Sequence, residues 1–131
     1  MSVYRAVCCC GALELEAQGE PALNAICHCD NCKRRTGSAF GWSIYFPDAD
    51  VDIRGEARVY AFDSASGRQE RSFCPACGST LFWRSAVFAG LTGVAGGPLA
   101  ASGGLGEPTT SASEGGRCAW LSLPETWQRW P

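Results

Sequence analysis

The sequence predicts a single, mainly β domain of 131 residues that is organised around metal-binding cysteines. Three observations favour this fold class: eight short stretches have strand-like patterns, no stretch of about 12 residues has the period of an amphipathic helix, and nine cysteines occur in tight groups. A composition of 46% hydrophobic and 18% charged residues is typical of globular proteins. It excludes disorder, collagen and coiled coil, so we expect one domain over residues 1–131.

The expected strands begin at residues 3–7 and 12–17, where apolar and polar residues alternate. The clearest alternation lies at residues 40–46, where aromatic and aliphatic side chains occupy every second position. This segment is therefore predicted to be a central strand. The remaining strands are expected between turns rich in Gly, Ser and Asp, at residues 22–26, 51–53, 57–62, 69–73 and 80–84.

Other segments depart from the strand pattern. Residues 33–37 read as a short helical turn closed by glycine. Residues 89–116 hold nine glycines among 28 residues and only two charged residues, so a long Gly/Ala/Ser-rich loop is expected there. The core pattern resumes at residues 120–124, and the i, i+3 spacing of Trp127 and Trp130 predicts a final helical turn against the sheet.

Charge and hydropathy limit the partners of the chain. The 11 Lys+Arg and 13 Asp+Glu give a formal net charge of −2, which does not favour a nucleic-acid partner. The longest nearly uncharged stretch, residues 85–105, is interrupted by glycines and a proline and lacks the roughly 20 apolar residues of a membrane span. The first residues do not follow the order of a signal peptide. We therefore expect a soluble, cytoplasmic protein without a membrane partner.

The nine cysteines carry most of the functional information. Their odd number, their clustering and the lack of an export signal argue against a disulfide framework. Clustered thiolates usually hold zinc, with an iron–sulfur cluster as the alternative. The cysteines are residues 8–10, then Cys27, Cys29 and Cys32, then Cys74 and Cys77, and finally Cys118.

The Cys-Pro-Ala-Cys-Gly sequence at residues 74–78 is typical of a zinc knuckle, which supplies two thiolates and needs two more ligands. Cys8 and Cys10 are one residue apart, so in an extended segment they lie on one face and can complete the site. Cys9 would then point the other way. These spacings predict a structural zinc on Cys8, Cys10, Cys74 and Cys77.

The middle group then retains three thiols, Cys27, Cys29 and Cys32. Closed structural zinc sites use four protein ligands, whereas catalytic sites keep one position for water or substrate. A trio therefore favours a catalytic zinc with room for a substrate thiol. The alternative is a second structural zinc that is closed by His28 or Cys118.

A run of three basic residues, Lys33, Arg34 and Arg35, directly follows this trio. Their charges can offset the formal negative charge of a zinc ion on three thiolates and can bind an anionic ligand. The alternative is an ordinary solvated basic turn.

The motifs and their order are similar to the family of glutathione-dependent formaldehyde-activating enzymes and centromere protein V. The motifs are Cys-x-Cys-Gly-Ala from residue 8, Cys-His-Cys-x-x-Cys-x-x-x-Thr-Gly-Ser-Ala-Phe from residue 27, and Phe-Cys-Pro-x-Cys-Gly-Ser-x-Leu-Phe from residue 73. The resemblance implies a zinc-ribbon-like, mainly β fold with two Zn²⁺ per chain. It implies a structural zinc on Cys8, Cys10, Cys74 and Cys77, and a catalytic zinc on Cys27, Cys29 and Cys32.

The resemblance also implies a carbon–sulfur lyase that forms or cleaves S-(hydroxymethyl)glutathione, the adduct of glutathione and formaldehyde. A glutathione thiol would occupy the open zinc position and, as a thiolate, attack formaldehyde. Arg34 or Arg35 would hold a glutathione carboxylate. The tail departs from the family pattern, because Ser111 stands where family members generally carry a histidine. The alternative function is a non-catalytic module in which both zinc ions are structural and the domain binds a partner.

Overall fold

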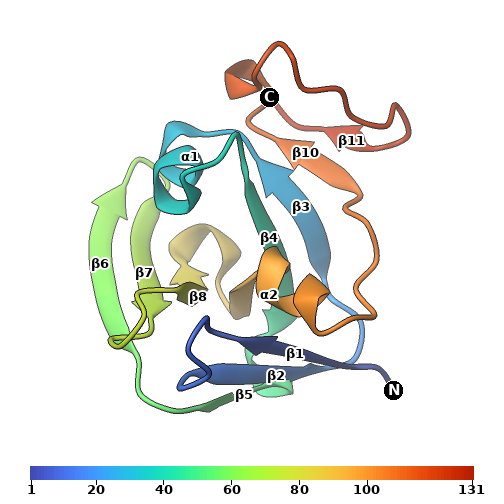
Figure 1. Cartoon of the computed structure of the whole chain (residues 1–131). Helices are drawn as coiled ribbons and strands as arrows, with labels where there is room; N and C mark the ends of the chain where they lie inside the picture. Colours follow the sequence, from blue (N-terminus) through green and yellow to red (C-terminus); the bar gives the residue numbers. More distant parts are fainter.

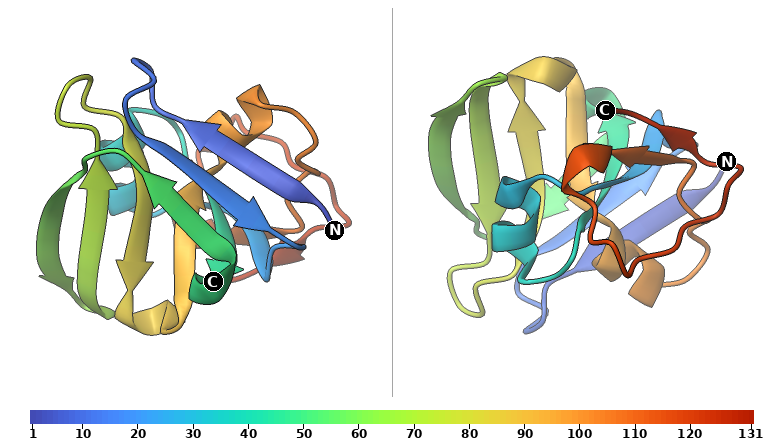
Figure 2. Two further views of the ribbon diagram at one scale, coloured as in Figure 1. Left: turned by 90° about the horizontal axis from the view of Figure 1, so that it is seen from below. Right: turned by 90° about the horizontal axis from the view of Figure 1, so that it is seen from above.

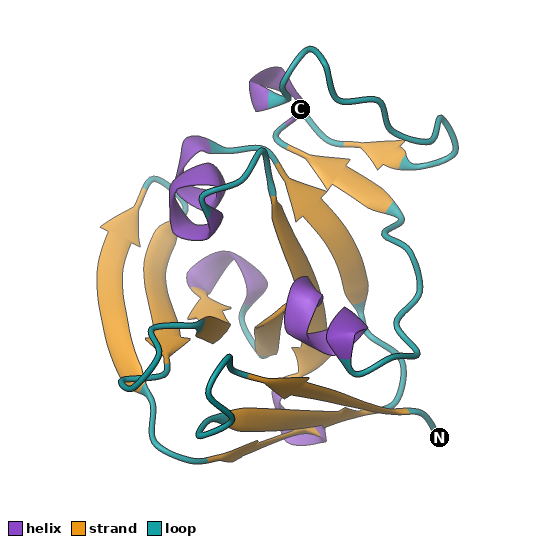
Figure 3. Cartoon of the chain, in the orientation of Figure 1, coloured by secondary structure: helices purple, strands orange, loops and turns teal.

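The computed structural model describes residues 1–131 and is mainly β, as the sequence predicts (Figures 1 and 3). It contains eleven strands, two short α-helices and three 3-10 turns. The strands are β1 (Val3–Val7), β2 (Glu14–Gln18), β3 (Leu23–Cys27), β4 (Gly41–Pro47), β5 (Val51–Arg54), β6 (Arg58–Ser64), β7 (Gly67–Phe73), β8 (Thr80–Ser85), β9 (Leu91–Ala95), β10 (Thr110–Ala112) and β11 (Gln128–Arg129). The helices are α1 (Asp30–Thr36) and α2 (Gly96–Ala101), and the 3-10 turns are η1 (Asp48–Asp50), η2 (Ala86–Phe88) and η3 (Glu114–Gly116).

The strands form two sheets. A small antiparallel sheet has the order β1-β2-β5, and a large sheet has the order β11-β10-β3-β4-β9-β8-β7-β6. The large sheet is antiparallel except at β10, which runs parallel to both β3 and β11. Seen from below, the small sheet lies in front of the large one (Figure 2, left). No helix in the structure is long and apolar enough to span a membrane.

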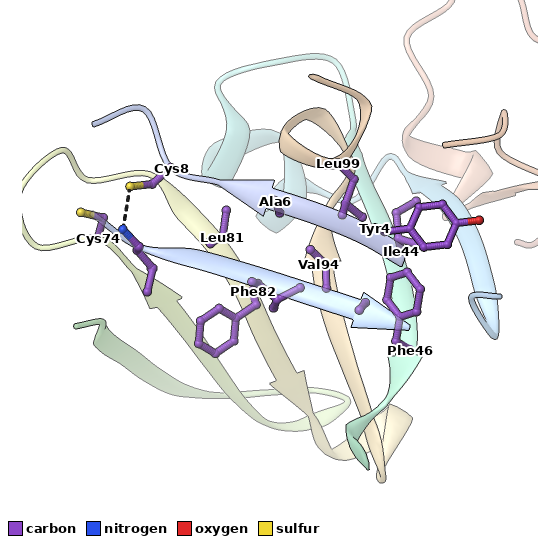
Figure 4. Packing of buried hydrophobic residues seen from close by; sticks show 13 residues of the cluster. Tyr4, Ala6, Cys8, Ile44, Phe46, Cys74, Leu81, Phe82, Val94 and Leu99 are labelled. Atoms are coloured by element: carbon purple, nitrogen blue, oxygen red, sulfur yellow. Dashed lines mark hydrogen bonds between the residues drawn. The ribbon is translucent and has the colours of Figure 1, made fainter. Parts of the chain in front are cut away.

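The main core fills the space between the two sheets (Figure 4). The alternating residues of β1 and β2 supply Tyr4, Ala6, Leu15 and Ala17 from the small sheet, as a half-buried strand requires. The large sheet supplies residues from β4, β8 and β9, and each fully buried aliphatic side chain contributes about 1.5–3 kcal/mol. The core is a cluster of Tyr4, Ala6, Cys8, Leu13, Leu15, Ala17, Ile44, Phe46, Cys74, Leu81, Phe82, Val94 and Leu99.

The predicted central strand at residues 40–46 is confirmed as β4, which pairs with β3 on one side and β9 on the other. Both of its faces are covered. Ile44 and Phe46 point into the main core, whereas Tyr45 belongs to a second cluster with Trp83 and Ala95 on the opposite face of the sheet. The candidate site lies on that opposite face of the large sheet.

The prediction of a long loop over residues 89–116 is wrong. This segment forms β9 inside the large sheet, then α2 and β10. Two of its glycines allow close packing: a Cβ on Gly93 would clash with the indole of Trp83, and a Cβ on Gly96 would clash with the indole of Trp42. These two glycines reflect contacts with tryptophans from other strands, whereas Gly90, Gly103 and Gly104 have the positive φ of turn glycines.

The predictions for the C-terminal segment are also wrong. Residues 128–129 form the edge strand β11 instead of a helical turn, and the N–H of Trp130 donates to the carbonyl oxygen of Ser111 at 2.9 Å. Residues 120–124 do not form core, because the side chain of Trp120 is 74% exposed. The tail gains its backbone hydrogen bonds at the edge of the large sheet, which a local sequence pattern cannot indicate.

Candidate metal centres and the adjoining cavity

The first cluster brings together the four cysteines predicted for the closed site, at one end of the core. The sulfurs of Cys8, Cys10, Cys74 and Cys77 all lie within 4.8 Å of one another. Cys8 and Cys74 are buried members of the main core (Figure 4), whereas Cys10 and Cys77 are exposed. Cys9 is exposed and lies outside the cluster. Four thiols in this arrangement could hold one metal ion.

Turns and amide donors shape this cluster. Residues 8–11 form a turn in which the N–H of Gly11 donates to the carbonyl oxygen of Cys8 at 3.1 Å, so the extended geometry expected for this segment is wrong. The N–H of Leu13 donates to Cys8 Sγ at 3.2 Å. A hydrogen bond with Ser79, whose Oγ is 3.2 Å from the sulfur, lowers the pKa of Cys77 to about 5. These contacts favour the thiolate form, which is the form that binds metals.

The second cluster consists of Cys27, Cys29 and Cys32, whose sulfurs also lie within 4.8 Å of one another. Cys27 ends β3, Cys29 is the N-cap of α1, and Cys32 lies in the first turn of that helix. Gly37 ends the helix in a left-handed conformation with φ 66°, which confirms the predicted helical turn. The strand-to-helix corner therefore gathers three thiols from six consecutive residues.

Neither of the two residues considered as a fourth ligand belongs to this cluster. His28 is fully buried, and its Nε2 lies 2.7 Å from the hydroxyl of Ser111. Cys118 is partly buried and is not a member of the cluster. The trio thus has three protein sulfurs and no fourth Cys, His, Asp or Glu donor.

A hydrogen-bonded chain anchors the corner that carries the trio. The hydroxyl of Ser111 donates to Glu114 Oε2 at 2.6 Å, so it accepts from His28 Nε2–H. Burial lowers the pKa of His28, which favours the neutral imidazole. The backbone N–H of His28 donates to the carbonyl oxygen of Ala112 at 3.0 Å. This positioning role was not predicted, although Ser111 is where the sequence departs from the family pattern.

The pKa values of Cys27 and Cys32 are shifted in opposite directions. The hydrogen bond with Cys32 lowers the pKa of Cys27 to about 5 and raises the pKa of Cys32. The sulfur of Cys27 is also 3.6 Å from the hydroxyl of Ser113, the one non-glycine residue with a positive φ, at 55°. These contacts favour the thiolate form of Cys27, the form that binds a metal cation.

A cavity of about 400 Å³ opens beside the trio, on the face of the large sheet that points away from the small sheet. Arg35, one of the two predicted anion-binding residues, lines it, whereas Arg34 is exposed and does not. The guanidinium carbon of Arg35 lies 4.2 Å from the ring centroid of Trp83. The indole of Trp83 packs against Gly93, and its Nε1 donates to Tyr45 Oη at 3.3 Å. The ring of Trp83 thus holds the guanidinium of Arg35 in place.

A second arginine, Arg71 on β7, lines the same cavity and was not predicted. Its Nη2 donates to Asn31 Oδ1 at 2.8 Å, which links β7 to α1. The strand at residues 69–73 was predicted, and its alternation places Gln69 and Arg71 on one face. Strand patterning cannot indicate that this face looks toward the cysteines, because that depends on the pairing order of the sheet.

The sequence model of the glutathione-dependent formaldehyde-activating enzymes matches residues 3–112, a range that holds both cysteine clusters. The chain belongs to this family. An uncharacterized lyase of Schizosaccharomyces pombe is 31% identical over 83 residues, which cover 63% of this chain and 58% of that protein. The match thus spans less than two thirds of the length of that relative.

A solved structure gives independent support for the fold. The crystal structure of a Rhodobacter sphaeroides protein superposes with a TM-score of 0.61 at 23% identity, and covers 78% of this chain and 90% of that chain. At this identity the likeness shows the fold alone. Membership of the glutathione-dependent formaldehyde-activating family, which the motifs predicted, is confirmed by the family match.

Proposed function

We propose that this chain is a zinc-dependent carbon–sulfur lyase-type enzyme that forms or cleaves the adduct of a thiol and an aldehyde. The name of the family suggests glutathione and formaldehyde as the substrates, and the name of the fungal relative suggests lyase chemistry. The observation that carries the proposal is the incomplete donor set of the trio: three sulfurs open onto a cavity that also presents a guanidinium.

The donor sets of both clusters fit zinc, which takes thiolates in sites of four ligands. Cys8, Cys10, Cys74 and Cys77 form a closed set that suits a structural ion. Cys27, Cys29 and Cys32 would hold a second ion that is one protein donor short, which leaves room for a substrate sulfur. When bound there, zinc would supply Lewis acidity that lowers the pKa of a thiol.

The reaction itself is a simple addition. The thiol sulfur forms a bond to the aldehyde carbon, the C=O π pair moves to the oxygen, and the proton released by the thiol ends on that oxygen. The reverse reaction breaks the carbon–sulfur bond and returns the thiol and the aldehyde.

The residues of the chain orient the thiol for this addition. Arg35 is fixed on Trp83 and can pair with a carboxylate of the substrate. Lys33 does not face the cavity, because its Nζ donates to the carbonyl oxygen of Gly116 at 2.5 Å, a contact that ties α1 to the tail. Of the three basic residues, Lys33 therefore has a structural role, Arg34 is exposed to solvent, and Arg35 lines the cavity.

The proposal is tested by replacing the metal with Co²⁺ and adding thiol. We expect two cobalt ions per chain, and an increase of the sulfur-to-cobalt charge-transfer absorption when glutathione is added, because the second ion gains a sulfur donor. The Cys118→Ser protein serves as the matched control and should respond equally. Absorption that does not change with any thiol would contradict the proposal and favour the alternative, a non-catalytic module with two structural zinc ions.

A further inference from the structure

We propose that Arg71 and Arg35 together form an anion subsite beside the cysteine trio, which selects short thiols that carry their own carboxylate. Arg71 is then a specificity-determining residue. The inference rests on the proposed function in one respect, because it requires that a thiol can reach the metal held by the trio. Beyond the proposed function, it names the chemical class of the thiol. It also assigns a role to Arg71, which lies on a strand far from the trio in sequence.

The charge pairing of the arginines gives the first observation. Arg35 and Arg71 are the only partly buried arginines of the chain, and neither has a carboxylate within ion-pair distance. A guanidinium that is withdrawn from water normally has an anionic partner, because its desolvation is otherwise uncompensated. Both of these unpaired cations line the same cavity. By contrast, six of the eight exposed arginines have a carboxylate partner: Arg5, Arg54, Arg68, Arg84, Arg117 and Arg129.

The two guanidiniums line the same cavity and repel each other. Burial, followed by the like charge of Arg35, lowers the pKa of Arg71. An anion bound in that cavity offsets the repulsion between the two cations. A carboxylate suits this position, since each guanidinium presents a fork of N–H donors.

Both guanidiniums are held in place before any ligand arrives. Arg71 uses Nη2 to reach Asn31, and its guanidinium carbon lies 5.0 Å from the ring centroid of Phe62. Arg35 rests on Trp83. Stacking on an aromatic face immobilises a guanidinium and leaves most of its N–H donors free. The side-chain entropy lost on binding an anion is therefore small.

The subsite adjoins the trio directly. The position that a Cβ on Gly41 would occupy is 2.5 Å from Arg35 Nη2 and 3.4 Å from Cys32 Sγ, so the guanidinium and the sulfur border the same small space. Asn31, which holds Arg71, lies between two cysteines of the trio in sequence, and α1 lies beside β7 (Figure 1). A carboxylate held by the arginines is thus near the sulfur that meets the metal. This proximity favours a thiol whose carboxylate is only a few bonds from its sulfur.

The experiment compares two thiols of similar length on the Co²⁺-substituted protein, with the charge-transfer absorption as the readout. Mercaptopropionate carries a carboxylate, and mercaptoethanol is uncharged. We expect wild type to bind mercaptopropionate about tenfold or more tightly than mercaptoethanol, since a charge-assisted hydrogen bond contributes about 1.5–3 kcal/mol. The substitution Arg71→Gln should remove most of this preference by weakening mercaptopropionate alone. Arg34→Gln, which changes an exposed arginine outside the cavity, should leave both affinities unchanged.

The outcomes separate this inference from the proposed function. If both thiols bind wild type equally, or if Arg71→Gln weakens both thiols by the same factor, the subsite is overturned and Arg71 only offsets the charge of the thiolates. If neither thiol changes the absorption, the proposed function fails and this inference fails with it. Arg71→Lys provides a second variant should Arg71→Gln not fold, and it should retain part of the preference because it keeps the charge without the fork of donors.

Discussion

Removal of the metal from the four-thiolate cluster is expected to unfold the whole domain. Cys8 and Cys74 are buried members of the main core, so the ligands of this cluster also hold the end of β1 near the start of β8. A structural zinc contributes an apparent 10–16 kcal/mol in small peptides, about as much as the roughly 5–15 kcal/mol net stability of a domain. Without the ion, the remaining interactions do not offset the chain entropy.

Circular-dichroism melting with and without a strong chelator measures this effect, and Cys74→Ser provides the matching variant. Cys9→Ser is the control, because Cys9 is adjacent to the cluster but exposed and outside it. We expect a cooperative transition for the metal-loaded wild type and for Cys9→Ser. The chelated protein and Cys74→Ser should show no such transition. Melting that is unaffected by chelation would show that the metal is not part of the folded core.

Substitution of one trio cysteine should have a different effect from removal of the first metal ion. The protein should lose the second ion but keep its fold. Cys32→Ser removes one of the three sulfur donors on a partly exposed corner, so the protein should lose most of its affinity for the second metal ion. The corner remains anchored through the contacts of His28 with Ser111 and of Arg71 with Asn31. The fold should therefore survive.

Metal analysis and melting on the same samples test this expectation. Metal content should fall from two ions per chain to one in Cys32→Ser, while the melting transition stays cooperative and the response to thiol disappears. The Cys118→Ser control should keep both ions, because Cys118 lies outside both clusters. Two ions retained in Cys32→Ser would mean that another group of the protein completes the second site.

Much of the β architecture follows from local pattern, because strand alternation is imposed by a two-sided environment. Residues 3–7 are β1 and residues 40–46 correspond to the interior strand β4. The segment from β9 to β10 was missed because a glycine-rich composition is typical of a loop, whereas Gly93 and Gly96 serve contacts with Trp83 and Trp42, which other strands supply. The edge strand β11 was missed because it forms by pairing with β10. Two residues are too few to show an alternating pattern in the sequence.

The candidate site likewise has residues that local sequence predicts and residues that only strand pairing brings to the site. Cysteine spacing identified both clusters, because metal ligands that are close in sequence leave few ways to reach one ion. Arg35 was found through its place after the trio. Arg71 and Ser111 were missed because each reaches the site through the order of strands in the large sheet, which pairing establishes and sequence does not reveal.

The central claim is that the second metal ion has three protein sulfurs and accepts a fourth from the substrate. X-ray absorption at the zinc edge, with and without added thiol, tests it most directly. We predict two zinc ions per chain with an average of about 3.5 sulfur donors per zinc without thiol and about 4 with it. An average of four sulfurs before thiol is added, or a spectrum that does not change on its addition, would contradict the claim.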